Sequence, residues 1–193
     1  IEIFIAPLYY LPYIILFIMK KCKLLITDLD GTLIETLSGD TFPKGIWDMK
    51  LKLYVFEAIK NYAPDDILII SNQGGIEKGF VDKEMFEYKF DYISSALEDY
   101  TNISVYNFYC DNNDKDNINR KPNTGMIDQY MDYIKFINDN VDEENKIIYD
   151  TIMMIGDASG KEGQFSDSDK KTAENFGCEY MDVDDFVYKY NNR

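Results

Sequence analysis

Two aspartates stand one residue apart in the stretch ITDLDGTLIET, residues 26–36, directly after an apolar run. Glycine follows them, so the chain can turn and Asp28 and Asp30 can converge on one point at the end of a strand. Two carboxylates in one pocket repel each other unless a divalent cation lies between them, and Mg²⁺ prefers such oxygen ligands. The pair therefore predicts a metal site, with an ordinary Asp-Gly turn as the alternative.

Further polar groups follow later apolar runs in the same way. A hydroxyl, amides and glycines can bind an anion, a pair of cations can neutralise it, and another acid can complete a metal site. Taken singly, each group has an ordinary alternative: a glycine turn, a solvated loop or a helix cap. A cap is our interpretation of Asp167 or Asp169. The groups are Ser71, Asn72, Gln73 and Gly74 after residues 67–70, Arg120 and Lys121 before Pro122, and Gly156 and Asp157 after residues 152–155.

Strand-like and helix-like segments alternate along residues 19–193 and predict how these groups are positioned. Crossovers long enough to carry a helix favour an α/β fold, with a mostly parallel sheet covered by helices on both faces. Such sheets bind ligands at the carboxyl ends of their strands. We expect strands at about 23–28, 66–71, 103–109, 149–156 and 178–182, and helices at about 52–62, 82–100, 123–138, 168–176 and 184–190.

Composition limits the chemistry and the compartment. With 46% hydrophobic residues the 193-residue chain should fold as one domain despite a net charge of −15. The chain contains no histidine, which excludes a Ser-His-Asp relay and the usual zinc sites with histidine ligands. Three widely spaced cysteines suggest no disulfide framework, so we expect an intracellular protein, cytoplasmic or nuclear.

The first 18 residues differ from the rest of the chain. Residues 3–18 carry no charge, include two prolines, and are followed by Met19. This run is shorter than the roughly 20 residues of a spanning helix and lacks the basic start of a secretory signal. We expect residues 1–18 to be an apolar extension, either non-native or upstream of a start at Met19, membrane-associated, or packed on the domain at residues 19–193. We expect no membrane partner for that domain.

The four groups, in this order and each after an expected strand, resemble the motifs of the haloacid dehalogenase (HAD) superfamily of aspartate-based phosphatases. The resemblance covers about residues 23–186. It implies a Rossmann-like fold, with Asp28 as the nucleophile and Asp30 as the general acid. It further implies that Ser71 and Lys121 contact the phosphoryl group. Mg²⁺ would be held by Asp28, Asp157 and the main-chain carbonyl of Asp30.

Physical chemistry supports these roles independently. A phosphate monoester repels an anionic nucleophile, so attack by a carboxylate needs a metal ion and a lysine to screen both partners. The attack would give an aspartyl-phosphate, which water hydrolyses with Asp30 acting as the base. The spacing between Asp30, Ser71 and Lys121 leaves room for a short flap but for no large cap domain. An open site of this kind can admit the end of a polymer.

Within the superfamily, the sequence resembles the polynucleotide 3′-phosphatases. The resemblance lies in the segments SGDTFP at residues 38–43, SNQGGI at 71–76, RKP at 120–122, and GDASG at 156–160 with FSDSD at 165–169. It implies that Asn72, Gln73, Gly74 and Arg120 bind the phosphate or the substrate. Phosphatases of histidinol phosphate or heptose bisphosphate share several motifs but typically carry a Cys/His zinc loop. Here the corresponding loop, residues 110–120, has one cysteine and no histidine.

The acidic charge indicates weak binding to nucleic acid, directed at 3′ ends, because phosphate contacts by cations supply most nonspecific affinity. No Gly-x-x-x-x-Gly-Lys-[Ser/Thr] loop for a 5′-kinase occurs in the sequence, so a kinase and a ligase would be separate partners. Two alternatives remain: a phosphatase of a small sugar or amino-alcohol phosphate, and a catalytically silent binding protein. The sequence does not separate DNA from RNA. Cations that could form local patches are Lys44, Arg120, Lys121, Lys161, Lys170 and Lys171.

Overall fold

The computed structural model describes residues 21–40, 43, 45–164 and 166–192. The apolar segment at residues 1–18 lies outside the described residues, so the expectations for it stay predictions. Over the described part of the chain, no helix is both long enough and apolar enough to cross a membrane.

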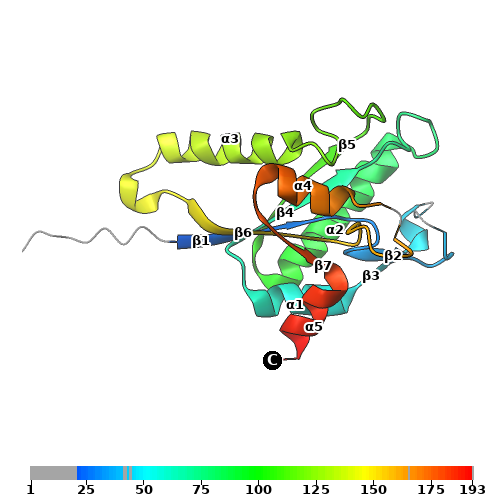
Figure 1. Ribbon diagram of the computed structural model, residues 1–193, viewed down its shortest axis with the longest axis horizontal. Coiled ribbons are helices and arrows are strands. Elements are labelled where there is room, and N and C mark those ends of the chain that lie inside the picture. The colour runs from blue at the N-terminus through cyan, green and yellow to red at the C-terminus, as the bar shows by residue number, and fades with distance from the viewer. Residues whose placement is uncertain (1–20, 41–42, 44, 165, 193) are drawn as a thin grey trace, which may run out of the picture.

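Five parallel strands form the central sheet, in the spatial order β5-β4-β1-β6-β7 (Figure 1). Thr27, the last residue of β1, lies beside Ile69 of β4 and Ile155 of β6; β6 ends at the next residue, Gly156, whereas β4 continues to Asn72. The α/β prediction is confirmed. The strands are β1 (Lys21–Thr27), β4 (Asp66–Asn72), β5 (Ser104–Cys110), β6 (Ile148–Gly156) and β7 (Glu179–Asp182).

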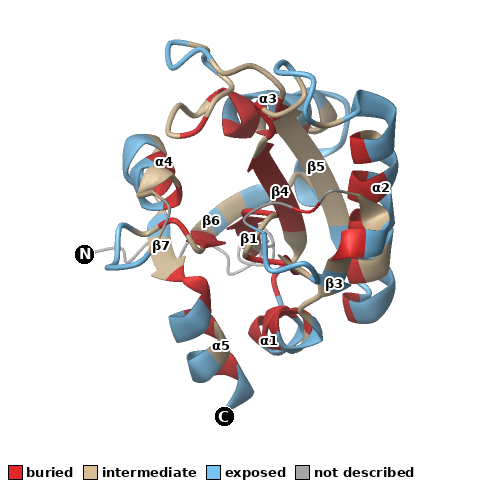
Figure 2. Ribbon diagram, turned by 90° about the vertical axis from the view of Figure 1, so that its right-hand side faces the viewer, coloured by how far each residue is buried: buried red, intermediate tan, exposed pale blue. Residues whose placement is uncertain are grey.

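Helices cover both faces of the sheet, with α3 and α4 above it and α1 and α5 below it in Figure 1. Alternate residues of β1 face opposite layers: Leu25 packs in the core cluster with α1, α2 and α5, whereas Leu24 and Ile26 pack with α3 and α4. Burial on both sides explains why the central strands read as continuous apolar runs (Figure 2). The helices are α1 (Leu53–Tyr62), α2 (Lys83–Thr101), α3 (Gly125–Asp139), α4 (Ser168–Phe176) and α5 (Val183–Asn191).

A small hairpin forms the flap between β1 and α1. β2 (Ile34–Thr36) pairs antiparallel with β3 (Met49–Leu51). The short 3₁₀ helix η2 (Ile46–Asp48) lies directly before β3, and a second 3₁₀ helix, η3 (Glu143–Asn145), lies before β6. The sequence predicts the flap by length but not its strands, which are too short to show a period.

Candidate active site

Asp28 stands at the carboxyl end of β1, next to the point where the strand order reverses between β1 and β6. Its side chain is 10% exposed, and its backbone N–H donates to the carbonyl of Ile155 at 3.1 Å. The Thr32 hydroxyl donates to Oδ2 at 3.1 Å, and the Lys121 Nζ donates to Oδ1 at 2.5 Å. The carboxylate is thus fixed by one donor on each oxygen.

Lys121 reaches this carboxylate from the loop that follows β5. Its ammonium group is buried and also donates to Asp169 Oδ1 at 2.7 Å and to the carbonyl of Ile70 at 3.2 Å. The Asn72 amide holds the lysine main chain, because its Oδ1 accepts from the Lys121 N–H at 2.9 Å and its Nδ2 donates to the Lys121 carbonyl at 3.0 Å. Both ends of Asn72 are therefore engaged in positioning Lys121. Phosphate binding by Asn72 stays a prediction.

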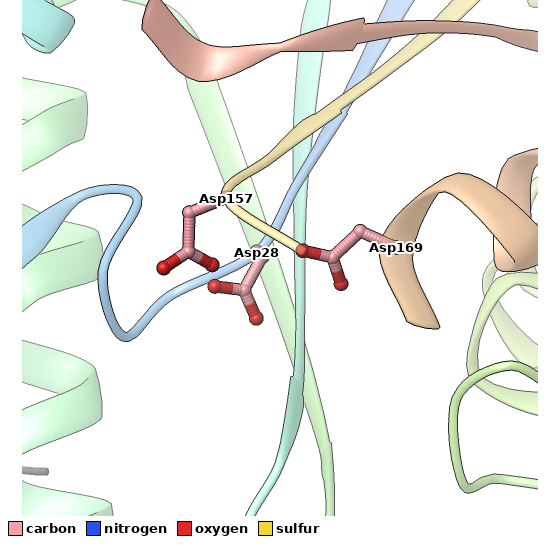
Figure 3. Close-up of side chains that lie close together, drawn as sticks. All are labelled: Asp28, Asp157 and Asp169. Carbon is pink, nitrogen blue, oxygen red and sulfur yellow. The ribbon is translucent and has the colours of Figure 1, made fainter. Parts of the chain in front are cut away.

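Three carboxylates converge beside this lysine. Oxygens of Asp28, Asp157 and Asp169 lie within 4.8 Å of one another, and the three side chains come from the ends of β1 and β6 and from α4 (Figure 3). Gly31 makes room for Asp157: its φ is +86°, and a Cβ there would collide with the Asp157 carboxylate. Gly156 makes room for Asp169 in the same way.

The helix-cap interpretation is wrong for Asp169. Its side chain is 1% exposed, pairs with Lys121, and accepts a hydrogen bond at 3.1 Å from the Ala158 N–H. Asp167 occupies the position before α4, but its side chain makes no capping bond and pairs with Lys171 on the surface at 2.6 Å. An aspartate in the first turn of a helix is usually a cap, so only the packing of α4 on the sheet shows the role of Asp169.

Charge balance in this cluster favours a divalent cation. When all three acids are ionised, three carboxylates and one ammonium leave two negative charges in excess, in a site where charges are largely removed from water. Burial raises the pKa of Asp28 to about 8 against the opposing effect of Lys121, and Asp169 and Asp157 add to the rise. Burial, with Asp169, also raises the pKa of Asp157 to about 6. Carboxylate oxygens in this number are ligands that suit Mg²⁺.

The electrostatics of Lys121 follow from the same neighbours. Burial acts to lower the pKa of Lys121, but Asp169 and Asp28 outweigh it and hold the pKa above its ordinary value. The lysine therefore stays positively charged in the site.

Asp30 turns away from this cluster toward β4 and α2. The Gln73 amide donates to Asp30 Oδ2 at 2.6 Å, and the Lys89 ammonium donates to Oδ1 at 3.2 Å. Gln73 also donates to the hydroxyl of Ser71 at 2.8 Å, so the predicted residues Ser71 and Gln73 are joined to Asp30. Lys89 was not among the residues predicted from the sequence. Its signal is a lysine between Phe86 and Phe90, on the apolar face of a helix.

Gly74 and Arg120 lie in loops that pack on one another. The Asn113 side chain donates to the Gly74 carbonyl, and a Cβ on Gly74 would collide with that amide. Arg120 donates from Nη1 to the Asn112 carbonyl at 3.0 Å and so closes its own loop. These contacts show loop packing; contact of either residue with substrate stays a prediction.

Comparison with known proteins identifies the family. The chain matches the family described as polynucleotide kinase 3 phosphatase over residues 23–187. The chain belongs to this family. It is 33% identical over 178 residues to the bifunctional polynucleotide phosphatase/kinase of Schizosaccharomyces pombe, covering 87% of this chain and 38% of that protein. The chain thus spans well under two thirds of this relative.

Two solved structures share the fold of this family member. A HAD-like phosphatase from Mesorhizobium loti aligns with a TM-score of 0.56 at 17% identity, over 82% of this chain and 70% of that one. The D,D-heptose 1,7-bisphosphate phosphatase of B. bronchiseptica, crystallised with magnesium and phosphate, aligns with a TM-score of 0.54 at 20% identity, over 88% of this chain and 98% of that one. The chain therefore has the fold of HAD-like phosphatases, which confirms the fold prediction. The match to the polynucleotide kinase 3 phosphatase family confirms the predicted resemblance.

Metal addition should stabilise the protein more as pH rises. In the metal-free folded state the pKa is about 8 for Asp28 and about 6 for Asp157, whereas both aspartates have a pKa of about 4 in the unfolded chain. The metal-free folded state therefore becomes less stable relative to the unfolded state as pH rises and these two aspartates lose their protons. Mg²⁺ binds the ionised carboxylates, so at lower pH it must first displace these protons. The melting temperature should increase more with Mg²⁺ at about pH 8.5 than at about pH 6. An equal increase at both pH values, or the same increase in Asp157→Asn, would contradict the site.

Removal of the central ammonium should unfold the protein at lower denaturant. Lys121→Met leaves buried carboxylates without their partner, which costs roughly 3–5 kcal/mol of unfolding free energy. Lys171→Met is the matched control, because it breaks an exposed pair with Asp167 and should change stability by less than about 1 kcal/mol. Urea unfolding at neutral pH without metal measures both. Equal losses of unfolding free energy in Lys121→Met and Lys171→Met would show that the buried contacts of Lys121 stabilise the fold no more than an exposed ion pair does.

Proposed function

We propose that this chain is a Mg²⁺-dependent polynucleotide 3′-phosphatase that hydrolyses 3′-phosphate ends through an aspartyl-phosphate on Asp28. The observation that carries the proposal is the contact of the Lys121 ammonium with both Asp28 and Asp169, beside Asp157, in a member of the polynucleotide kinase 3 phosphatase family. This arrangement places a carboxylate nucleophile beside a fixed positive charge.

The chemistry of the chain's own residues follows from their positions. Asp28 attacks phosphorus while the bond to the leaving oxygen breaks, and Lys121 offsets the negative charge that accumulates on the phosphoryl oxygens. Asp30 gives its proton to the leaving oxygen, so the products are an alcohol and phosphorylated Asp28. Water then attacks phosphorus, Asp30 accepts its proton, and Asp28 is restored as phosphate departs.

Binding of the metal would fall to Asp28, Asp157 and the main-chain carbonyl of Asp30. Bound Mg²⁺ supplies Lewis-acid screening of the phosphate oxygens. Asp169 lies in the same cluster but has one oxygen on Lys121 and the other on the Ala158 N–H. We assign Asp169 to the orientation of Lys121.

The form of the site suits the end of a polymer. The flap is a hairpin of two three-residue strands, and a cavity of about 170 Å³ lies between this flap and the Asp30 turn. Among the described residues, so short a covering element suits a substrate chain that continues into solvent. Nucleic-acid end repair is the role that this activity would serve.

The charges around the site support weak binding. Two cations proposed for local patches are already compensated, since Lys161 pairs with Asp182 and Asp185, and Lys171 pairs with Asp167. Lys121 is buried between Asp28 and Asp169, so it adds no exposed charge to such a patch. Lys44 lies outside the described residues. Glu35 and Asp40 line the cavity beside Asp30 and disfavour additional phosphates there.

Phosphate release tests the proposal. Residues 19–193 and Asp28→Asn are assayed with Mg²⁺ on a 3′-phosphorylated oligonucleotide, its 5′-phosphorylated isomer and a sugar phosphate. We expect release from the 3′ end alone, reduced at least about a thousandfold in the variant, because its amide is a poor nucleophile. Asp167→Asn is the control, since this exposed aspartate lies outside the cluster and should leave activity unchanged.

Other outcomes distinguish the alternatives. Turnover of the sugar phosphate alone would keep the aspartate chemistry and reject the polynucleotide substrate. Turnover of no substrate would reject the phosphatase proposal in favour of a silent binding protein. Full activity of Asp28→Asn would reject Asp28 as the nucleophile.

A further inference from the structure

Lys89 is a buried cation without a role in the chemistry described above. It lies on the core-facing side of α2, 5% exposed, between Phe86 and Phe90 of the hydrophobic core. Its ammonium group lies 5.2 Å from the centroid of the Phe86 ring. Lysine is almost never buried unless it is paired, because its ammonium loses its hydration. The position therefore requires a specific partner.

That partner is Asp30, the proposed general acid. The Lys89 ammonium lies 3.2 Å from Asp30 Oδ1, and the two side chains are 7% and 8% exposed. The Gln73 amide occupies the other oxygen, Oδ2, at 2.6 Å. One donor on each oxygen fixes both the place and the plane of the carboxyl group. Gln73 in turn is tied to Ser71, so the contact links α2 to the ends of β1 and β4.

We propose that Lys89 is a positioning residue, which holds the Asp30 carboxyl group in the orientation from which it exchanges a proton with the leaving oxygen. This proposal rests on the proposed phosphatase function. The Lys89 ammonium faces Asp30 and not the proposed nucleophile Asp28, whose carboxylate pairs with Lys121. Stability alone does not account for it, because an apolar side chain between Phe86 and Phe90 would fill the core without desolvating a charge.

The test compares substrates that differ in their need for a proton. An alkoxide leaving from a 3′-phosphorylated oligonucleotide or from glycerol phosphate requires protonation, whereas nitrophenolate leaves as a stable anion. Lys89→Met should lower kcat/KM roughly 10- to 100-fold on the two alkyl phosphates and far less on para-nitrophenyl phosphate. Lys89→Arg should restore part of the loss, because guanidinium also donates to a carboxylate.

Two controls separate positioning from a general loss of structure. Lys83→Met makes the same substitution on the same helix at a residue 53% exposed, and it should leave all three kcat/KM values unchanged. In an Asp30→Asn background, Lys89→Met should cause no further loss, because the two residues act as one unit. Circular dichroism at the assay temperature checks that each variant is folded.

Three results decide the question. Equal losses of kcat/KM on alkyl and nitrophenyl phosphates, or losses that multiply in the double variant, would overturn the role of Lys89. Selective loss on both alkyl phosphates would support it. Failure of the polynucleotide assignment has a different signature: wild type would leave the oligonucleotide intact, while Lys89→Met would still lose activity on glycerol phosphate relative to nitrophenyl phosphate.

Discussion

The buried ammonium of Lys121, between the carboxylates of Asp28 and Asp169, is the interaction on which the site depends. Charges removed from water need partners, and one ammonium cannot balance the three acids gathered there. Burial, with the neighbouring acids Asp169 and Asp157, raises the pKa of Asp28. The same group of buried acids makes the site suitable for a divalent cation. Lys121 and a cation would then share the task of keeping the nucleophile ionised.

The parallel sheet makes this concentration of charge possible. The carboxyl ends of β1, β4 and β6 lie at one edge of the sheet, so residues far apart in the chain meet there. Neighbouring residues also position the charged groups. The Asn72 side chain forms hydrogen bonds with the main chain of Lys121, and Gly31 and Gly156 leave space for the carboxylates of Asp157 and Asp169. Asp30 lies in a second, separate ion pair with Lys89. Two carboxylates close in sequence thus have distinct surroundings, as distinct chemical roles require.

Much of this architecture could be predicted from the sequence because strands buried on both faces are continuous apolar runs. Acids, a hydroxyl and a lysine at the ends of those runs indicated where Asp28, Ser71, Lys121 and Asp157 would lie. Asp169 could not be recognised, because an aspartate near the start of a helix is commonly a cap. Lys89 disturbs the apolar face of α2, but its partner is 59 residues away. Only the packing of α2 on the sheet brings the two together.

The central claim is that phosphate passes through Asp28, and the stereochemical course at phosphorus tests it most directly. The substrate is an oligonucleotide whose 3′-phosphorothioate is made chiral with heavy oxygen isotopes, hydrolysed in isotope-labelled water. Two successive in-line displacements, first by Asp28 and then by water, predict net retention of configuration in the released thiophosphate. Net inversion would show direct attack by water and would contradict Asp28 as the nucleophile.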